Sequence, residues 1–191
     1  MNALLSNETN CLRCGAPLTP DAQDGMCLKC LQQRLMNAYL KLRPWTDIES
    51  CQCAEVTALV LDDCLADNPI HCAICKKEVD PERLGLTVEE VEAVATWHSV
   101  NRSLYALWHD SREYEDYAKA RLEDLGGQVN QEGMKVARML SARLPTCVCL
   151  FRNCMDDDYE LEVVDCPVCG KPLEKNVHYG SGRCMDCHVF L

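Results

Sequence analysis

The spacing of the cysteines constrains this fold more than any other feature of the sequence. The chain of 191 residues holds 16 cysteines, and two stretches each contain a C-x2-C pair, a short spacer and a second C-x2-C pair. The pairs are Cys11/Cys14 with Cys27/Cys30, and Cys166/Cys169 with Cys184/Cys187. A C-x2-C turn directs two thiolates at one metal ion, and two such turns supply the four sulfur ligands of a structural zinc site. The sequence therefore predicts two Zn2+ sites.

Two further features support this prediction. Gly15 and Gly170 directly follow the first pair of each module, where glycine permits the left-handed turn that such a loop needs. Each module is too short to build a core, so metal binding has to supply its folding free energy, on the order of 10 kcal/mol. Because four thiolates leave no open coordination position, we expect the zinc to hold the fold and not to activate water.

A third group of cysteines is spaced less regularly. It consists of Cys51, Cys53, Cys72 and Cys75. These thiols could form a third zinc site across a hairpin over residues 56–70, with Cys64 and His71 as substitute ligands, or they could stay unliganded. A further alternative is an open zinc site built from some of the same cysteines or His71, which would make the protein a metalloenzyme.

The other clustered cysteines favour packing over metal binding. They are Cys147, Cys149 and Cys154. They lie on or after a predicted strand, and alternation places the first two on one face of it. The run from Cys184 to His188 also matches the C-x-x-C-H pattern of covalent haem attachment, but Cys166 and Cys169 compete for those thiols. No βαβ pattern surrounds a C-x-x-C pair, which argues against a thioredoxin-like redox role.

The cysteine-free middle of the chain is predicted to be helical. Thr87 and Glu90 form a capping box, and apolar residues then recur at three-to-four spacing as far as Trp108. Further helices are predicted over residues 111–125, 130–144 and 28–43, with Asn130 as the N-cap of the second of these. Strands are predicted over residues 56–61, 146–151 and 159–164.

Two histidines on the first of these helices invite a catalytic interpretation, which we do not favour. His109 is followed by Asp110, but neighbouring residues on a helix do not face each other. We expect His98 to be a surface or core residue and not a metal ligand.

Together these elements predict an α+β fold in which small zinc modules, treble-clef-like at the N-terminus and a zinc ribbon at the C-terminus, flank a helical middle region. We divide the chain into four segments. They are 1–45, an N-terminal four-cysteine module with a helix; 46–86, the Cys-rich hairpin region; 87–145, the helical region; and 146–191, a strand followed by the C-terminal four-cysteine zinc ribbon.

The charge of the chain bears on its partner. Each four-thiolate zinc site adds two negative charges, so two sites lower the formal net charge from −11 to −15. Affinity for DNA or RNA depends on Lys and Arg that neutralise phosphates, so nucleic acid is disfavoured although two small basic patches exist. They are Arg34, Lys41 and Arg43, and Lys171, Lys175 and Arg183. An acidic surface speeds the encounter with a basic protein, so we expect a protein partner, such as a toxin or nuclease that the chain inhibits.

The sequence indicates neither export nor a membrane. The first residues lack a basic region followed by a long apolar core, and no aliphatic run approaches the ~20 residues of a membrane span. We therefore expect a cytoplasmic protein, in which paired thiols favour metal over disulfides. The oligomeric state stays open.

Several short motifs occur in an order that matches a known family. They are residues 69–75, 104–108, 114–115, 117–118, 129–133, 150–152 and 166–170, with Cys184 and Cys187. On these motifs the chain from about Asn68 onward, roughly two thirds of its length, resembles an uncharacterised bacterial family of zinc-ribbon proteins that is provisionally described as nucleic-acid-binding. Residues 147–149 stand where aromatic residues are expected, which supports packing, and the module over 11–30 has no place in that pattern. The resemblance implies zinc more firmly than nucleic acid.

The sequence thus favours a non-enzymatic zinc protein that acts as an interaction module for a protein partner, either as an adaptor or as an acidic inhibitor. A nucleic-acid-binding zinc-ribbon protein and a metalloenzyme are the alternatives.

Overall fold

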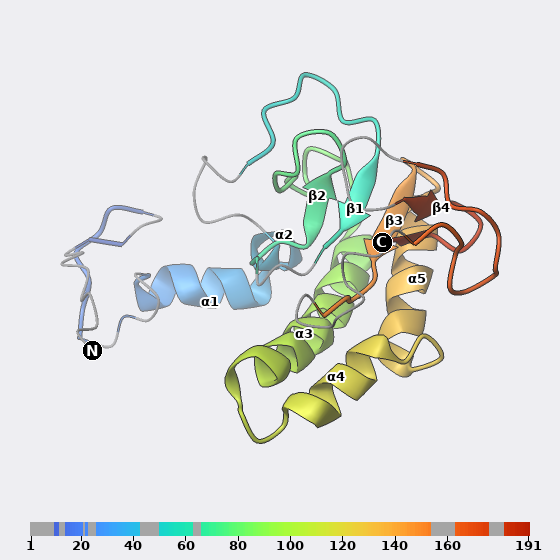
Figure 1. Ribbon diagram of the computed structural model, residues 1–191. Helices are drawn as coiled ribbons and strands as arrows, with labels where there is room; N and C mark the ends of the chain where they lie inside the picture. Colours follow the sequence, from blue (N-terminus) through green and yellow to red (C-terminus); the bar gives the residue numbers. More distant parts are fainter. Residues whose placement is uncertain are drawn as a thin grey trace.

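The chain folds into helices that pack on one mixed sheet (Figure 1). The computed structural model describes residues 10–11, 14–20, 22, 26–42, 50–62, 66–153, 163–175 and 182–191. Within these ranges the chain forms five α-helices and a five-stranded sheet. This mixture of helix and sheet, with cysteine clusters on either side of a helical middle, confirms the predicted α+β class.

The sheet is built from short strands that lie far apart in the sequence. They are β1 (Leu59–Leu61), β2 (Ile70–Cys72), β3 (Thr146–Cys149), β4 (Arg183–Cys184) and β5 (Val189–Phe190). The order across the sheet is β2-β1-β3-β5-β4, with β1, β3 and β5 parallel and an antiparallel hairpin at each edge. The β1–β2 hairpin confirms the one predicted over residues 56–70. Of the strand predicted over 159–164, residues 159–162 lie outside the described residues and the last two are not in a strand.

The middle of the chain forms three helices. They are α3 (Val88–Asp110), α4 (Glu115–Glu123) and α5 (Gln128–Leu140). The predicted capping box is present, because the Thr87 hydroxyl accepts from the Glu90 amide and the Glu90 carboxylate accepts from the Thr87 amide. The helix predicted from residue 111 begins at Glu115 instead, since Arg112 takes a left-handed conformation with φ of 58° that an α-helix cannot continue through.

The predicted role of Asn130 as a helix N-cap is wrong. Gly127, with extended backbone, precedes α5, and Asn130 lies inside the helix and is buried. Its side-chain amide donates to the carbonyls of Leu122 and Asp124 at 2.8 and 3.0 Å. These carbonyls belong to the end of α4, where the helix leaves its last acceptors without partners. Asn130 therefore joins α4 to α5.

The helix predicted over 28–43 is divided into α1 (Leu28–Met36) and α2 (Ala38–Lys41). The break occurs at Asn37, whose backbone is extended and whose side chain accepts from the Tyr39 amide at 3.1 Å. An Asn side chain can compete with the helical hydrogen-bond pattern in this way, so a new helix starts where the old one would have continued.

The main core lies between the helices and one face of the sheet. Leu59 and Leu61 of β1 point into it, whereas Val60 points to a smaller cluster on the opposite face. Helices α3 and α5 approach closely at Gly133, where an added Cβ would lie 2.8 Å from Nε1 of Trp97. The indole N–H of Trp97 also donates to the Val129 carbonyl at 3.1 Å. All three residues of β1 are buried, which is typical of a sheet covered on both faces.

Candidate metal centres

Twelve cysteines gather into three groups of four. They are the N-terminal cluster (Cys11, Cys14, Cys27 and Cys30), the middle cluster (Cys51, Cys53, Cys72 and Cys75) and the C-terminal cluster (Cys166, Cys169, Cys184 and Cys187). Within each cluster the four Sγ atoms all lie within 4.8 Å of one another. Every described cysteine is a free thiol. The structure thus brings together the residues of both predicted modules, and it also brings together the four cysteines of the third group.

The separations of the thiols match those expected around a single ion. The Sγ atoms of Cys14 and Cys27 lie 3.8 Å apart, and those of Cys169 and Cys184 lie 3.7 Å apart. Sulfurs at the corners of a tetrahedron, each about 2.3 Å from zinc, are separated by about 3.8 Å. A disulfide would require about 2.05 Å. The donor set and its spacing therefore fit a tetrahedral metal ion.

Three of the half-sites share one backbone design, which we call the knuckle. In the first, the Cys11 amide donates to the Ala16 carbonyl at 2.6 Å and the Gly15 amide donates to the Cys11 carbonyl at 2.8 Å. The same two hydrogen bonds recur at Cys72 and at Cys166. The residue after the second cysteine has a positive φ each time. These residues are Gly15 at 70°, Lys76 at 62° and Gly170 at 71°.

The second pairs of the two predicted modules are held differently. Cys184 is the last residue of β4 and Cys187 lies in the turn that joins β4 to β5, and the next residue, His188, has a φ of 58°. Cys27 is instead the N-cap of α1, and Cys30 lies in its first turn. Burial raises the pKa of the Cys30 thiol to about 12, so its ionisation needs an opposing positive charge such as a metal ion. The N-terminal cluster therefore combines a knuckle with a helix N-terminus, as the treble-clef-like prediction requires.

In the middle and C-terminal clusters, burial and hydrogen bonds shift the pKa values of individual thiols in opposite directions. In the middle cluster, burial opposes ionisation of Cys51, but a backbone N–H and the neighbouring thiols outweigh it and lower the pKa. Burial and the same neighbours raise the pKa of Cys75 to about 12. In the C-terminal cluster, the backbone N–H of Lys171 lowers the pKa of Cys169, while burial raises that of Cys187. Within each of these clusters the pKa of one thiol is lowered and that of another is raised, so a cation is needed to stabilise four thiolates together.

Other cysteines stay outside the clusters. Cys147 is buried against the Met185 sulfur at 3.5 Å, and its burial raises the pKa of the thiol to about 12. Cys149 is half-buried in the same small apolar cluster, so both pack on one face of β3 as predicted. Cys64 and Cys154 lie outside the described residues.

The histidines considered as ligands or catalysts also lie apart from the clusters. His71 is buried, and its two ring nitrogens each lie 3.1 Å from a backbone carbonyl, those of Lys76 and Asn68. His98 is a buried residue of α3, as expected. The argument that His109 and Asp110 cannot meet is wrong, because Nδ1 and Oδ1 lie 2.7 Å apart. At the last turn of α3 the side chains can bend around the helix end, but both are well exposed.

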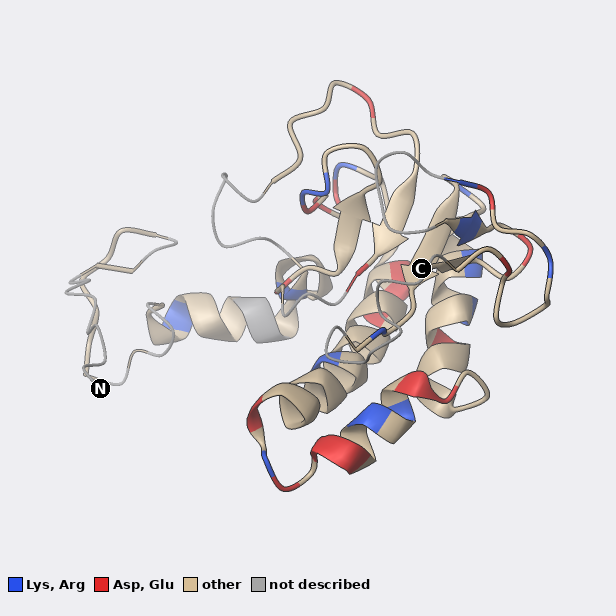
Figure 2. Cartoon of the chain, in the orientation of Figure 1, with Lys and Arg blue, Asp and Glu red and all other residues tan. Residues whose placement is uncertain are grey.

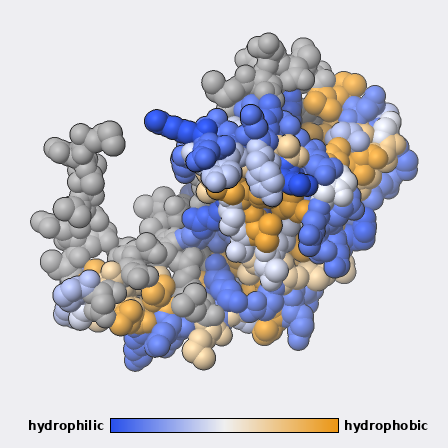
Figure 3. Space-filling view, turned by 90° about the horizontal axis from the view of Figure 1, so that it is seen from below, coloured by the Kyte–Doolittle hydropathy of each residue, from blue (hydrophilic) through white to orange (hydrophobic). Residues whose placement is uncertain are grey.

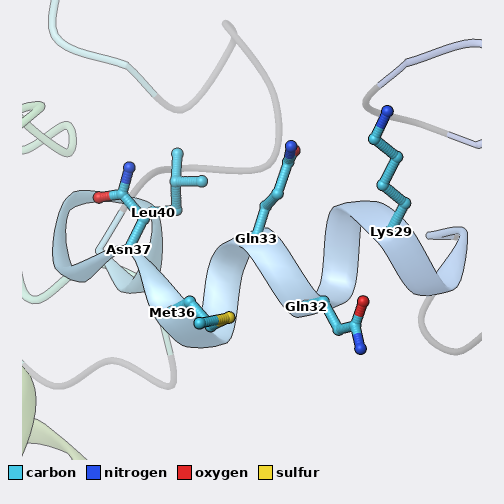
Figure 4. Close-up of a pocket in the computed structure, with 6 residues that line it drawn as sticks. All are labelled: Lys29, Gln32, Gln33, Met36, Asn37 and Leu40. Carbon is cyan, nitrogen blue, oxygen red and sulfur yellow. The ribbon is translucent and has the colours of Figure 1, made fainter.

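A depression of about 520 Å3 lies along the N-terminal helices. Six residues of this segment line it, and they are shown as sticks in Figure 4. They are Lys29, Gln32, Gln33, Met36, Asn37 and Leu40. Lys29 and Gln33 point to one side of α1, whereas Gln32 and Met36 point to the other (Figure 4). The polar groups do not converge, so the clusters remain the better candidate sites.

The sequence reasoning left the middle cluster open and missed the residues around it. Lys76 occupies the position that glycine takes in the other two knuckles, so the glycine pattern does not extend to this site. A positive φ is uncommon for a residue with a side chain. The only signal in the sequence was the C-x2-C spacing of Cys72 and Cys75, and a motif this short does not establish a metal site by itself.

No protein-family model, no curated protein and no solved structure matches this chain. Among the described residues, no helix combines the length and the apolar character that crossing a membrane requires.

Proposed function

We propose that the chain binds three zinc ions in four-thiolate sites that stabilise its fold, and that it acts as a non-enzymatic interaction module for a basic protein. The observation that carries this proposal is the gathering of twelve thiols into three sets of four, with the Sγ atoms of each set within 4.8 Å of one another. Sulfur-only tetrahedral sites suit zinc or iron. Zinc is the ion of choice for a site that supports a fold without redox chemistry. The resemblance to a zinc-ribbon family supports the same ion.

Metal analysis of the purified protein tests the first half of the proposal. We expect three zinc ions per chain and, in the folded protein, no reaction of a thiol reagent beyond the four cysteines outside the clusters, of which the buried Cys147 should react slowly if at all. Chelation should release the zinc and expose the other twelve thiols. A protein that stays folded without any bound metal would overturn the proposal. Three iron ions per chain in place of zinc would change the identity of the proposed metal.

The four-thiolate sets favour a structural role over catalysis. Catalytic zinc sites keep one position for water or substrate. Each cluster supplies four sulfur donors, and both ring nitrogens of His71 face carbonyls instead of the middle cluster. X-ray absorption that finds four sulfurs per zinc would agree with this role. A zinc-bound water that exchanges with an inhibitor would support the metalloenzyme alternative.

The surface charges favour a protein partner. Three zinc sites would bring the formal net charge from −11 to −17. Three described cations of the two basic patches pair with acids, at distances of 2.9, 2.5 and 3.0 Å; the pairs are Lys41–Glu92, Lys171–Asp186 and Arg183–Glu174. Figure 2 shows Lys and Arg spread over several elements instead of gathered along one. Hydrophilic residues cover most of the face in Figure 3, with hydrophobic residues in small patches among them.

Binding measurements separate the two kinds of partner. A mixture of DNA and RNA at low salt, where phosphate contacts are strongest, should give no mobility shift. Purification from the native host should instead recover a basic protein that salt elutes and nuclease treatment does not release. Recovery of nucleic acid, or the absence of any basic protein, would contradict this half of the proposal and leave the zinc sites unaffected.

A further inference from the structure

The middle cluster contains a half-site unlike the others. Its knuckle at Cys72 and Cys75 is fixed by backbone hydrogen bonds within the turn. The other half-site, Cys51-Gln52-Cys53, is a C-x-C segment, and among the described residues 50–58 no backbone hydrogen bond joins one residue of this segment to another. The position of its two thiols must therefore be set from outside the segment.

Two neighbours hold the backbone of this segment. The Cys51 amide donates to the carbonyl of Glu78 at 2.7 Å, and Glu78 in turn forms an isolated β-bridge with His71 of β2. The guanidinium of Arg83 binds the opposite groups: Nη1 donates to the Cys51 carbonyl at 2.5 Å and Nη2 donates to the Cys53 carbonyl. One planar cation thus spans both cysteines, which a monodentate ammonium cannot do.

The arrangement also orients the peptide dipoles. With the carbonyls of the C-x-C segment directed at Arg83, the backbone N–H of Cys53 is left to face the sulfur of Cys51. A backbone N–H directed at a sulfur favours the thiolate form. Arg83 is itself held in a tight turn before α3, since its amide donates to the Asp80 carbonyl at 3.0 Å.

We propose that Arg83 is the positioning residue of the middle cluster: its guanidinium, bound to the carbonyls of Cys51 and Cys53, fixes the C-x-C half-site for a metal ion. This inference rests on the proposed function, in which the cluster binds zinc. Groups that orient metal ligands without touching the metal typically contribute 10–100-fold to affinity. Because the Arg83 side chain is exposed, its replacement leaves no cavity in the core.

Competition with a chelator tests the proposal on the full chain. Arg83→Gln should lower the zinc affinity of one site in three by about tenfold or more, and Arg83→Lys should recover only part of the loss. Arg143→Gln is the matched control, since Arg143 binds the Glu90 carboxylate at the α3–α5 boundary and touches none of the clusters. In a Co2+ titration, about a third of the thiolate absorption of Arg83→Gln should develop only at about tenfold higher free Co2+, whereas the control should titrate like the wild type.

A Cys72→Ser background identifies the affected site. There, adding Arg83→Gln should cause no further loss of metal, because the middle cluster is already disabled. A further loss would mean that Arg83 acts on the whole fold, and an unchanged chelator profile for Arg83→Gln alone would equally overturn the inference. A wild-type chain that binds only two metals, with Cys51 and Cys53 freely reactive, would instead count against the proposed function at this cluster.

Discussion

The N-terminal and C-terminal clusters share a local design but are embedded differently. Both begin with the sequence C-x2-C-G-x-P-L and fold it into the same knuckle. Yet Cys11 and Cys30 pack with Met26 in a small core of their own, whereas Cys166 and Cys184 belong to the main core. The local sequence around the first cysteine pair therefore sets the shape of the knuckle. The core in which the cluster is buried determines which part of the fold its metal would stabilise.

Helices α1 and α2, which connect the N-terminal cluster to the rest of the structure, explain why the two clusters are embedded differently. We call the sheet together with α3, α4 and α5 the body. Helix α2 is attached to the body, because Tyr39 donates to the Leu86 carbonyl at 2.7 Å and Lys41 pairs with Glu92. Helix α1 packs on α2 and extends away from the body, with the N-terminal cluster near its far end (Figure 1). We therefore expect the N-terminal cluster to fold and unfold separately, and the other two clusters to unfold with the sheet that carries them.

The largest effect is expected from removing a ligand of the C-terminal cluster. Cys184 is buried in the main core and lies in β4. Cys184→Ser should release the zinc of that cluster and destabilise the body by about 5 kcal/mol, half of what a structural zinc contributes to a small finger. Thermal unfolding should shift down by about 10–20 °C.

Cys149→Ser is the control, because Cys149 lies in β3 of the same sheet and belongs to no cluster. It should keep all the zinc and almost all the stability. An equal shift for both variants would show that thiol packing, and not metal, stabilises this end of the sheet.

A ligand of the N-terminal cluster should have an effect confined to its own region. Cys11→Ser should release one zinc and open the segment before α2 to hydrogen exchange, since Cys11 and Cys30 are themselves part of the small core around Met26. The unfolding temperature of the body should stay unchanged. Slower or unchanged exchange in that segment, or a lower stability of the body, would show that the two regions are one cooperative unit.

Local patterns in the sequence were sufficient where one segment determines its own structure. The capping box of α3, the β1–β2 hairpin and the two C-x2-C modules are all set by residues within about 20 positions of one another. The predictions failed where a side chain found a partner elsewhere. Asn130 serves the end of α4 instead of starting a helix, and Asn37 starts a helix inside a predicted one.

The middle cluster shows the same limit at the level of a site. Its cysteines are drawn from the segment before β1 and from the hairpin after it, so their meeting depends on the pairing of Ser50 and His71 with Glu78. The position of Arg83 depends in turn on the path from the hairpin into α3. Neither is visible in the spacing of the residues, because both arise from contacts between segments.

Gly133 of α5 lies where this helix packs against Trp97 of α3. A Cβ at Gly133 would lie 2.8 Å from Nε1 of Trp97 and 3.2 Å from a methyl of Val148. Gly133→Ala should therefore push α5 away from α3 and destabilise the body by about 1–3 kcal/mol. Denaturant unfolding followed through Trp97 fluorescence measures this. The chelator profile of the N-terminal cluster should not change, and a change would contradict the separation of the two regions.

A matched pair of glycines compares the regions more finely. Gly15 and Gly170 have φ of 70° and 71°, and a Cβ at either would meet nothing within 4 Å. Alanine at either position should therefore cost only the backbone strain, about 1 kcal/mol. Gly170→Ala should lower the stability of the body by that amount, whereas Gly15→Ala should weaken only zinc binding at the N-terminal cluster. Equal effects of both variants on the unfolding of the body would contradict the claim that the N-terminal cluster unfolds separately.

The smallest effect concerns pH and should also be confined to the body. Hydrogen bonds from Arg143 lower the pKa of the Glu90 carboxyl, with a further contribution from the Thr87 amide. A carboxyl whose pKa is lowered by folding stabilises the fold above its ordinary pKa of 4.5, and this contribution is lost as the pH falls through the lower folded value. The difference in unfolding free energy between the wild type and Arg143→Gln should therefore be constant near neutral pH and shrink in acid. With zinc in excess in both samples, metal loss affects the two alike and cancels in the difference. A difference that grows as the pH falls would mean that Arg143 stabilises the body through another contact, and that the α3–α5 boundary does not depend on this ion pair.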